Sequence, residues 1–185
     1  CWALAEKTFR DLISDKRVWF GKDGKSRPRL KKFLSENEGV TTWTWWPHSE
    51  VGNNQEATKI LNEVMTRSDV FDNPKPPRLI ERILQISTEK NSIIIDSFAG
   101  SGTTGHAIMQ LDKSDGGNRR FILLQMPFET EEQKQKDQNI ARDITAERLR
   151  RVCNGYKKSN GESVEGLGGG FRYCKLGPSV FGADG

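Results

Sequence analysis

Residues 92–126 carry the pattern that most constrains how this chain can fold. A short run of β-branched side chains, SIIID at 92–96, leads into a glycine-rich loop, a helical pattern and a second apolar run, RRFILLQM at 119–126. Continuous apolar runs of this length are typical of parallel strands that are covered on both faces. A strand, a glycine loop, a helix and a second strand within 35 residues predict a βαβ unit with a right-handed crossover.

The loop after the first predicted strand has the pattern G-x-G-x-x-G from Gly100 to Gly105. Glycines in such a loop let the backbone turn tightly and come close to a ligand, and ligands in these sheets bind beyond the carboxyl ends of the strands. A triphosphate-binding loop would carry a lysine where His106 stands, so that class is rejected. A dinucleotide would favour an acid at the end of the next strand, where the neutral Gln125 stands, and this counts against the second class.

A sulfonium cofactor is the third class of ligand that this loop could hold. Such a cofactor carries a positive sulfur, an ammonium group and a carboxylate. Asp96, directly before the loop, can face the cationic part, and N–H donors of the loop and of the following helix can serve the carboxylate. The residues alone favour this class and leave the dinucleotide class open.

The remaining segments give coarser predictions. In the first part of the chain we expect strands at 17–21 and 41–46, a hairpin turn at Asp23-Gly24 and a helix over 29–36. Further along we expect helices over 53–65, 77–87, 102–113 and 137–158, an exposed connection at 129–136, a mobile glycine-rich segment at 162–170 and a strand at 171–176.

Charge is concentrated near the start of the chain, although the net charge of +4 is modest. The stretch 16–32 holds eight basic side chains against the single acid Asp23, and it forms a candidate phosphate-facing surface or a solvated loop. The eight are Lys16, Arg17, Lys22, Lys25, Arg27, Arg29, Lys31 and Lys32. Trp43, Trp45 and Trp46 suit either the same surface or a core.

Cellular context can be read from two further features of the composition. The three cysteines are odd in number and widely spaced, which fits neither a disulfide framework nor a metal pattern, so no metal is expected. No run of 18 apolar residues and no leader pattern occurs, so no membrane contact is expected. These features favour a cytoplasmic location.

The stretch DSFAGSGTT, residues 96–104, resembles the cofactor loop of the amino-methyltransferases that modify exocyclic nitrogens of DNA bases. The usual form there is Asp-Pro-Phe-x-Gly-Ser-Gly-Thr-Thr, and Ser97 replaces the proline. FDNPKPPRLIERIL, just upstream, resembles the motif that precedes this loop in the same family. More narrowly, RVWFGKDGKSRPRLKKFLSE, EVGNNQEATKIL, RRFILLQM and ITAERLRRV look like the C-terminal half of the modification subunit of type III restriction–modification systems.

The resemblance implies a fold and a division of the chain. The fold class would be α/β, with part of a Rossmann-like S-adenosylmethionine-dependent methyltransferase sheet and an N-terminal α+β appendage. Residues 1–70 would belong to the DNA-recognition region and 71–158 to the cofactor-binding part of the methyltransferase domain. Residues 159–185 would form a glycine-rich C-terminal segment with a strand.

The resemblance also implies a set of residues around S-adenosylmethionine. Lys75 would pair with the methionine carboxylate of the cofactor. Gln125 stands where many relatives carry an acid for the ribose hydroxyls, which suggests weaker cofactor binding. The full set is Phe71, Lys75, Asp96, Phe98, Ala99, Gly100, Ser101, Gly102, Thr103, Thr104 and Gln125.

The family's catalytic motif, Asp-Pro-Pro-Tyr or a close variant, is absent from this sequence. The motif lies N-terminal to the cofactor loop in this group, so we expect the chain to be a C-terminal part that is inactive alone, with an apolar sheet edge left uncovered. The whole enzyme would methylate adenine N6 in double-stranded DNA, as a homodimer that works with a restriction subunit carrying helicase and nuclease activity. The alternatives are a non-enzymatic nucleotide- or DNA-binding module with a Rossmann-like core and, less favoured, a dinucleotide oxidoreductase.

Overall fold

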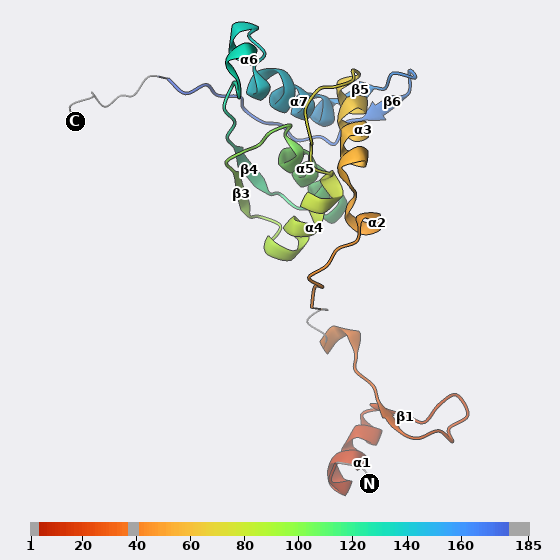
Figure 1. Ribbon diagram of the computed structural model, residues 1–185. Coiled ribbons are helices and arrows are strands. Elements are labelled where there is room, and N and C mark those ends of the chain that lie inside the picture. The colour runs from red at the N-terminus through yellow and green to blue at the C-terminus, as the bar shows by residue number, and fades with distance from the viewer. Residues whose placement is uncertain (1–3, 37–40, 178–185) are drawn as a thin grey trace, which may run out of the picture. The chain divides into compact units, whose positions relative to one another are not determined.

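A computed structural model of the protein describes residues 4–36 and 41–177 (Figure 1). The chain divides into two compact units, with the division between Trp43 and Thr44. Each unit is built around its own contacts. No helix in the described part of the chain is both long enough and apolar enough to cross a membrane.

The first unit contains a helix, a small hairpin and a single 3-10 turn. Helix α1 (Glu6–Ser14) leads into strand β1 (Val18–Trp19), which pairs antiparallel with β2 (Arg29–Leu30), and η1 (Leu34–Glu36) follows. The predicted first strand and hairpin are therefore confirmed. The predicted helix over 29–36 is wrong. Its first two residues, Arg29 and Leu30, pair with β1 as a strand, and only 34–36 form a single 3-10 turn.

The second unit begins with three helices: α2 (His48–Val51), α3 (Asn54–Met65) and α4 (Pro77–Ser87). The side chain of Asn53 accepts a hydrogen bond from the N–H of Glu56 and so caps α3, and Pro77 occupies the first turn of α4, where no N–H is needed. The strand expected at 41–46 does not form. Trp43 and Trp45, at 77% and 74% exposure, do not belong to a core.

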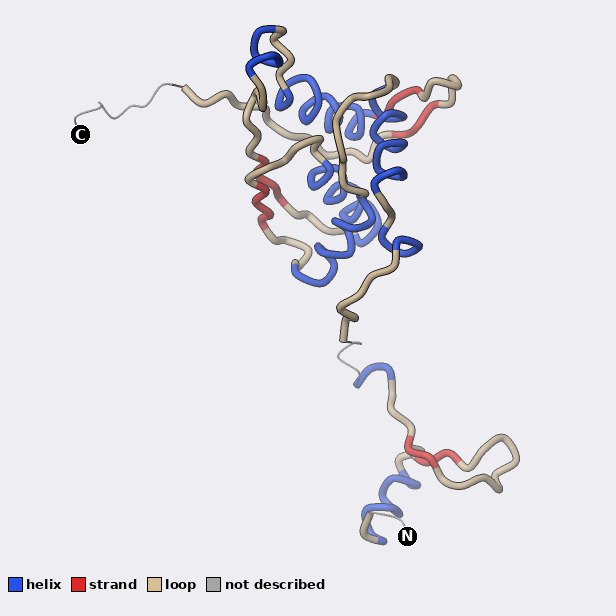
Figure 2. The backbone as a smooth tube through the Cα atoms, in the orientation of Figure 1, coloured by secondary structure: helices blue, strands red, loops and turns tan. Residues whose placement is uncertain are grey.

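The βαβ prediction is confirmed in its elements and its pairing. Strand β3 (Ile93–Asp96) pairs in parallel with β4 (Arg120–Leu123), and α5 (Thr103–Asp115) connects them. Helices α4 and α5 lie on one side of the pair, as Figure 2 shows. Leu84, Ala107, Ile108 and Leu111 form the core there, with Ile80, Ile94 and Phe121 packed against it.

The opposite face of β3 and β4 is exposed, so coverage of both faces is not found in the described residues. Ile93, Ile95 and Ile122 point to this side and are at least half exposed. A two-stranded parallel pair is small for an α/β protein, so the structure supports a mixed α/β class and leaves a larger Rossmann-like sheet as an expectation.

The C-terminal part folds back over the start of the second unit. Helix α6 (Glu131–Gln135) lies in the connection predicted to be exposed. The helix predicted over 137–158 forms over a shorter range, as the π-helix η2 (Ala141–Ala146) followed directly by α7 (Glu147–Asn154). Strands β5 (Gly155–Lys157) and β6 (Ser163–Glu165) form an antiparallel pair. Helix α7 packs on α3 and α5, with Val64, Met109, Leu149, Val152 and Cys153 as the core.

The strand predicted at 171–176 is not formed, and the segment expected to be mobile contains β6 instead. Leu167 and Phe171 pack against the core beside α3 and α7, so burial of single side chains replaces strand pairing there. The packing of α3 on α7 also places residues 44–70 in the same compact unit as the glycine loop.

Candidate functional site

The glycine loop lies between the end of β3 and the start of α5, as the sequence pattern requires. Gly100 and Gly102 have φ angles of 53° and 78°, in the left-handed region that glycine adopts without steric cost. The N–H of Ala99 donates to the carbonyl of Leu124 over 3.0 Å, and the N–H of Gly102 donates to the carbonyl of Ala99 over 2.8 Å. The loop is thus tied to β4 and turns back on itself before the helix.

Asp96 closes the entrance of the loop with both carboxylate oxygens engaged. Its Oδ1 accepts from the backbone N–H of Phe98 at 3.0 Å, and its Oδ2 accepts from the Thr104 hydroxyl at 2.5 Å. The residue is half-buried, so the negative charge keeps contact with the solvent side of the loop. This arrangement places a fixed carboxylate where a cationic group of a ligand can approach it.

Gln125, just beyond β4, contacts the loop directly. Its Oε1 accepts a hydrogen bond from the N–H of Gly100 at 2.7 Å, and its Nε2 donates to the carbonyl of Met126 at 3.1 Å. An amide oxygen has two lone pairs, so one remains for a further donor such as a ribose hydroxyl. Gln125 therefore also holds the glycine loop in place through Gly100, a role that the sequence did not indicate.

The Pro-Lys-Pro segment upstream of α4 meets the same loop. A Cβ on Gly100 would stand 3.3 Å from the ring of Phe71, so the ring lies directly against the loop backbone. The Thr103 hydroxyl donates to the backbone carbonyl of Lys75 at 3.2 Å. The Lys75 side chain is exposed, and its ammonium donates to the carbonyl of Asn73 at 3.4 Å. Segments that are 25 or more residues apart in the sequence therefore converge on the loop.

The predicted site residues do not all face the same way. Ala99, Ser101, Gly102 and Thr103 are buried, and their side-chain positions face the interior behind the loop. Phe98 is 86% exposed, and Asp96, Gly100 and Thr104 are half-buried. The accessible part of the predicted set is therefore smaller than the motif.

Arg148 also belongs to this region, although it lies outside the motifs that predict the site. Its side chain from α7 is completely buried behind the loop, and its Nη1 donates to the Ser101 hydroxyl at 3.0 Å and to the Thr103 hydroxyl at 2.9 Å. Its Nη2 lies 3.1 Å from Nδ1 of His106. Burial lowers the pKa of the Arg148 guanidinium to about 10, which leaves it charged at neutral pH.

His106 is neutral in this setting. Burial, and then the neighbouring Arg148 charge, lower the pKa of His106 from its usual 6.5 to about 3. Because Arg148 can only donate, Nδ1 of His106 is the acceptor and its proton sits on Nε2. The signal that could have found this cluster is the stretch ITAERLRRV, in which Thr145 and Arg148 are three residues apart and so share a helix face.

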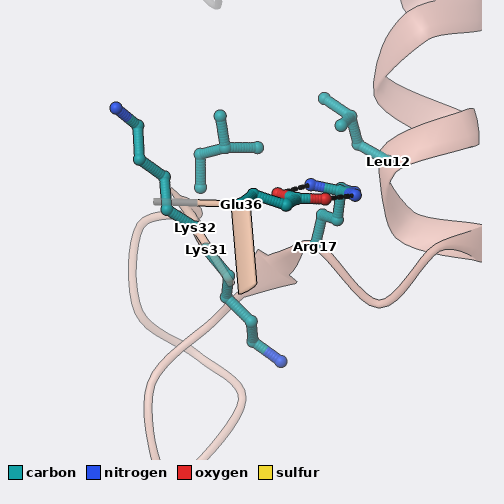
Figure 3. A pocket seen from close by; sticks show the side chains of 6 residues that line it. Leu12, Arg17, Lys31, Lys32 and Glu36 are labelled. Atoms are coloured by element: carbon teal, nitrogen blue, oxygen red, sulfur yellow. Dashed lines mark hydrogen bonds and ion pairs between the residues drawn. The ribbon is translucent and has the colours of Figure 1, made fainter. Parts of the chain in front are cut away.

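One of the eight basic side chains of 16–32, that of Arg17, forms an ion pair within the first unit, and the other seven are exposed. The Arg17 guanidinium forms a bidentate ion pair with Glu36 (Figure 3), which raises the pKa of Arg17 and lowers that of Glu36. The guanidinium also stacks over the ring of Phe33, 4.9 Å from the ring centroid. A shallow cleft of about 280 Å³ lies beside this pair, with Lys31 and Lys32 on its rim. The seven other basic side chains of 16–32 are exposed.

Metal chemistry has no candidate centre in the part of the chain that the structure describes. No three His, Cys, Asp or Glu side chains are grouped there as a metal ion would require. The groups present at the glycine loop are the Asp96 carboxylate, the Gln125 amide, the Thr104 hydroxyl and the ring of Phe71.

These features define an α/β protein whose glycine loop is contacted by three segments that are distant in sequence: the segment before α4, the end of β4, and the segment of η2 and α7. Comparison with known proteins identifies the family. A family model described as "DNA methylase" matches residues 4–155. The chain belongs to this family. The resemblance to amino-methyltransferases noted in the sequence is thereby confirmed.

The similar proteins include modification subunits of type III restriction–modification enzymes. The StyLTI Mod subunit of Salmonella typhimurium strain LT2 is 33% identical over 90% of this chain, and the EcoPI Mod subunit of Escherichia phage P1 is 29% identical over 92% of it. The type II methyltransferase M.KpnI of Klebsiella pneumoniae is 34% identical over 52% of the chain. The chain spans about a quarter of the length of these relatives: 26%, 26% and 22%.

Proposed function

We propose that this chain is the cofactor-binding part of a site-specific DNA adenine-N6 methyltransferase that uses S-adenosylmethionine. The observation that carries the proposal is the convergence of Asp96, Gln125 and the Phe71 segment on one glycine loop. A loop held only for packing would not need an acid at its mouth and an amide from the next strand. The similarity to type III Mod subunits supports the same assignment.

The residues at the loop fit the groups of S-adenosylmethionine. The Asp96 carboxylate suits the ammonium and the positive sulfur, and the second lone pair of the Gln125 oxygen suits a ribose hydroxyl. Phe71 lies against the loop, and the exposed Phe98 offers a second aromatic surface for an adenine ring. The bound cofactor would supply the methyl group. The role of this chain is to bind and orient that donor.

The residues that would grip an extruded base are not in this sequence, since it has no Asp-Pro-Pro-Tyr motif. We therefore expect no methyl transfer by this chain alone, and activity from the longer polypeptide that carries it. The exposed cations of 16–32 would contact DNA phosphates, which fix position and carry no base information. A homodimer of the full subunit and a restriction subunit are the protein partners that we propose.

Calorimetric titration of the full-length protein tests the cofactor assignment. We expect S-adenosylmethionine and its demethylated product to bind and NAD to give no heat of binding. Incubation with a methyl-labelled cofactor and DNA, followed by nucleoside analysis, should then give N6-methyladenine. Binding of NAD alone would overturn the cofactor assignment, and N4-methylcytosine as the product would overturn the choice of base.

A non-enzymatic DNA-binding module is the second candidate function, favoured only by the exposed basic stretch of the first unit. Binding of DNA by the full-length protein, without binding of either cofactor form and without methylated product, would support this candidate over the methyltransferase.

A further inference from the structure

The back of the glycine loop is held by two side chains from one helical segment, and neither belongs to the cofactor motif. The Thr145 hydroxyl donates to the carbonyl of Gly100 at 2.6 Å, and Nη1 of Arg148 lies 3.3 Å from the next carbonyl, that of Ser101. Two successive loop carbonyls are thus contacted by residues three apart on the segment where the π-helix η2 passes into α7.

Arg148 extends this contact into a chain of hydrogen bonds. Nη1 donates to the Thr103 hydroxyl at 2.9 Å, and that hydroxyl donates to the backbone carbonyl of Lys75 at 3.2 Å. One guanidinium therefore links α7, the start of α5 and the Pro-Lys-Pro segment. These are the elements that meet at the candidate site.

The burial of Arg148 argues against an incidental contact. The side chain has 0% exposure, and in the described ranges 4–36 and 41–177 no carboxylate forms an ion pair with it. A buried cation without a counter-ion is costly unless it is hydrogen-bonded, and here each guanidinium nitrogen has an acceptor on Ser101, Thr103 or His106. The hydrogen bonds that offset the cost of burying Arg148 therefore include those to Ser101 and Thr103 of the glycine loop.

The consequence for the loop follows from peptide geometry. All described peptide bonds are trans, so the N–H of each peptide unit points opposite to its carbonyl. When the carbonyl of Gly100 is held toward Thr145, the N–H of Ser101 is directed away from η2. The left-handed φ angles of Gly100 and Gly102 allow this turn, and a Cβ on Gly102 would lie 3.2 Å from Thr145, so the contact is close.

We propose that Thr145 and Arg148 are positioning residues that fix the glycine loop in its ligand-binding conformation. The inference rests on the proposed function only for the identity of the ligand. The loop conformation itself can be measured without any ligand, so the two proposals can fail separately.

The variants are chosen in matched pairs and made in the full-length protein. Thr145→Val keeps the shape and removes the hydroxyl, and Thr145→Ser keeps the hydroxyl. Arg148→Met removes the guanidinium. Its control is Arg119→Met, because Arg119 is also buried and contacts the other end of α5 through Asp112 and Asp115.

The first readout is hydrogen–deuterium exchange of the peptide covering 97–105, measured by mass spectrometry without ligand. We expect faster exchange in Thr145→Val and Arg148→Met, and exchange like the natural protein in Thr145→Ser and Arg119→Met. Unchanged exchange in folded Thr145→Val would overturn the proposal. If Arg148→Met does not fold, the threonine pair still decides the outcome.

The second readout is the dissociation constant for S-adenosylmethionine. We expect about a fivefold loss of affinity in Thr145→Val, the size of one hydrogen bond, and at least about a tenfold loss in Arg148→Met, with a change below about twofold in Arg119→Met and Thr145→Ser. Equal losses in the two arginine variants would overturn the proposal and assign both residues to general stability. If exchange of the loop is faster in Thr145→Val and Arg148→Met but the natural protein binds no cofactor, the positioning role stands and the proposed function is wrong.

Discussion

The side-chain oxygen of Gln125 lies 2.7 Å from the backbone nitrogen of Gly100 and accepts its hydrogen bond. This contact joins the end of β4 to the turn of the glycine loop, across 25 residues of sequence. It gives Gln125 a structural task in addition to the ribose contact that we propose for it.

Replacement of Gln125 by Glu tests both tasks of the residue. A carboxylate still accepts the Gly100 N–H and can form charge-assisted hydrogen bonds to ribose hydroxyls, so we expect about fivefold tighter binding of S-adenosylmethionine, or ~1 kcal/mol. Calorimetry of the full-length protein measures the change, with Gln125→Leu as the variant that should lose affinity. A clear loss of affinity in Gln125→Glu would refute the ribose contact.

Replacement of Gly102 by Ala should disturb the loop more than the same change at the other end of α5. Gly102 and Gly116 both have left-handed φ angles, so alanine costs about 1 kcal/mol or more of strain at each. Only at Gly102 does the new Cβ meet Thr145, at 3.2 Å, whereas Gly116 has nothing within 4 Å. We expect Gly102→Ala to lower the free energy of unfolding by at least ~1 kcal/mol more than Gly116→Ala. Urea unfolding measures both, and equal costs would contradict the close contact.

The neutral state of His106 predicts a loss of stability in acid. Its pKa in the folded protein is about 3, below the usual 6.5, so the unfolded chain binds the proton first as the pH falls. This contribution is complete above pH 6.5, and between pH 7 and 5 it should fall by about 2 kcal/mol. Replacement of His106 by Asn keeps an acceptor for Arg148 and should remove this part of the pH dependence.

The matched control is His48→Asn, which changes an exposed histidine. Unfolding in urea at pH 7 and pH 5 gives the difference for each variant. The same pH dependence in His106→Asn and in the natural protein would show that folding does not lower the pKa of His106.

The same substitution at two neighbouring isoleucines of β3 should change two different properties of the protein. Ile95 is 66% exposed on the open face of β3 and β4, and Ile94 packs into the core beside α4 and α5. We expect this exposed apolar face to make the chain self-associate, and Ile95→Thr to reduce that association while changing the free energy of unfolding by less than about 0.5 kcal/mol. Ile94→Thr should cost about 2 kcal/mol. Light scattering and urea unfolding measure the two effects, and unchanged association in Ile95→Thr would count against the exposed face.

The exposed cations of the first unit should control the salt dependence of DNA binding. Lys22, Lys25 and Arg27 lie in the hairpin connection and are exposed. Changing all three to Ala should reduce the slope of log affinity against log salt by about 3 in the full-length protein, roughly one for each phosphate contact. Arg10→Ala, on α1 outside the basic stretch, is the control. Equal slopes in the triple variant and in Arg10→Ala would remove this surface from the DNA interface.

Local pattern was sufficient wherever a segment's neighbours in sequence decide its structure. The βαβ elements, the left-handed glycines and the start of α4 at Pro77 follow from apolar runs and from the conformational limits of glycine and proline. The same reasoning failed for 29–36 and 171–176. There, pairing of Arg29 and Leu30 with β1, and burial of Phe171 beside α3 and α7, outweigh local periodicity.

The sequence by itself determined the family, the position of the glycine loop and the residues of its motif, because these are carried by short, contiguous patterns. Only the tertiary structure decided which of those residues face outward and which are buried. It also decided that Arg148 and Thr145, more than 40 residues away, hold the loop from behind. The reason is physical: the partner of a buried cation is set by packing between distant segments, and no local pattern records which carbonyl a distant side chain will reach.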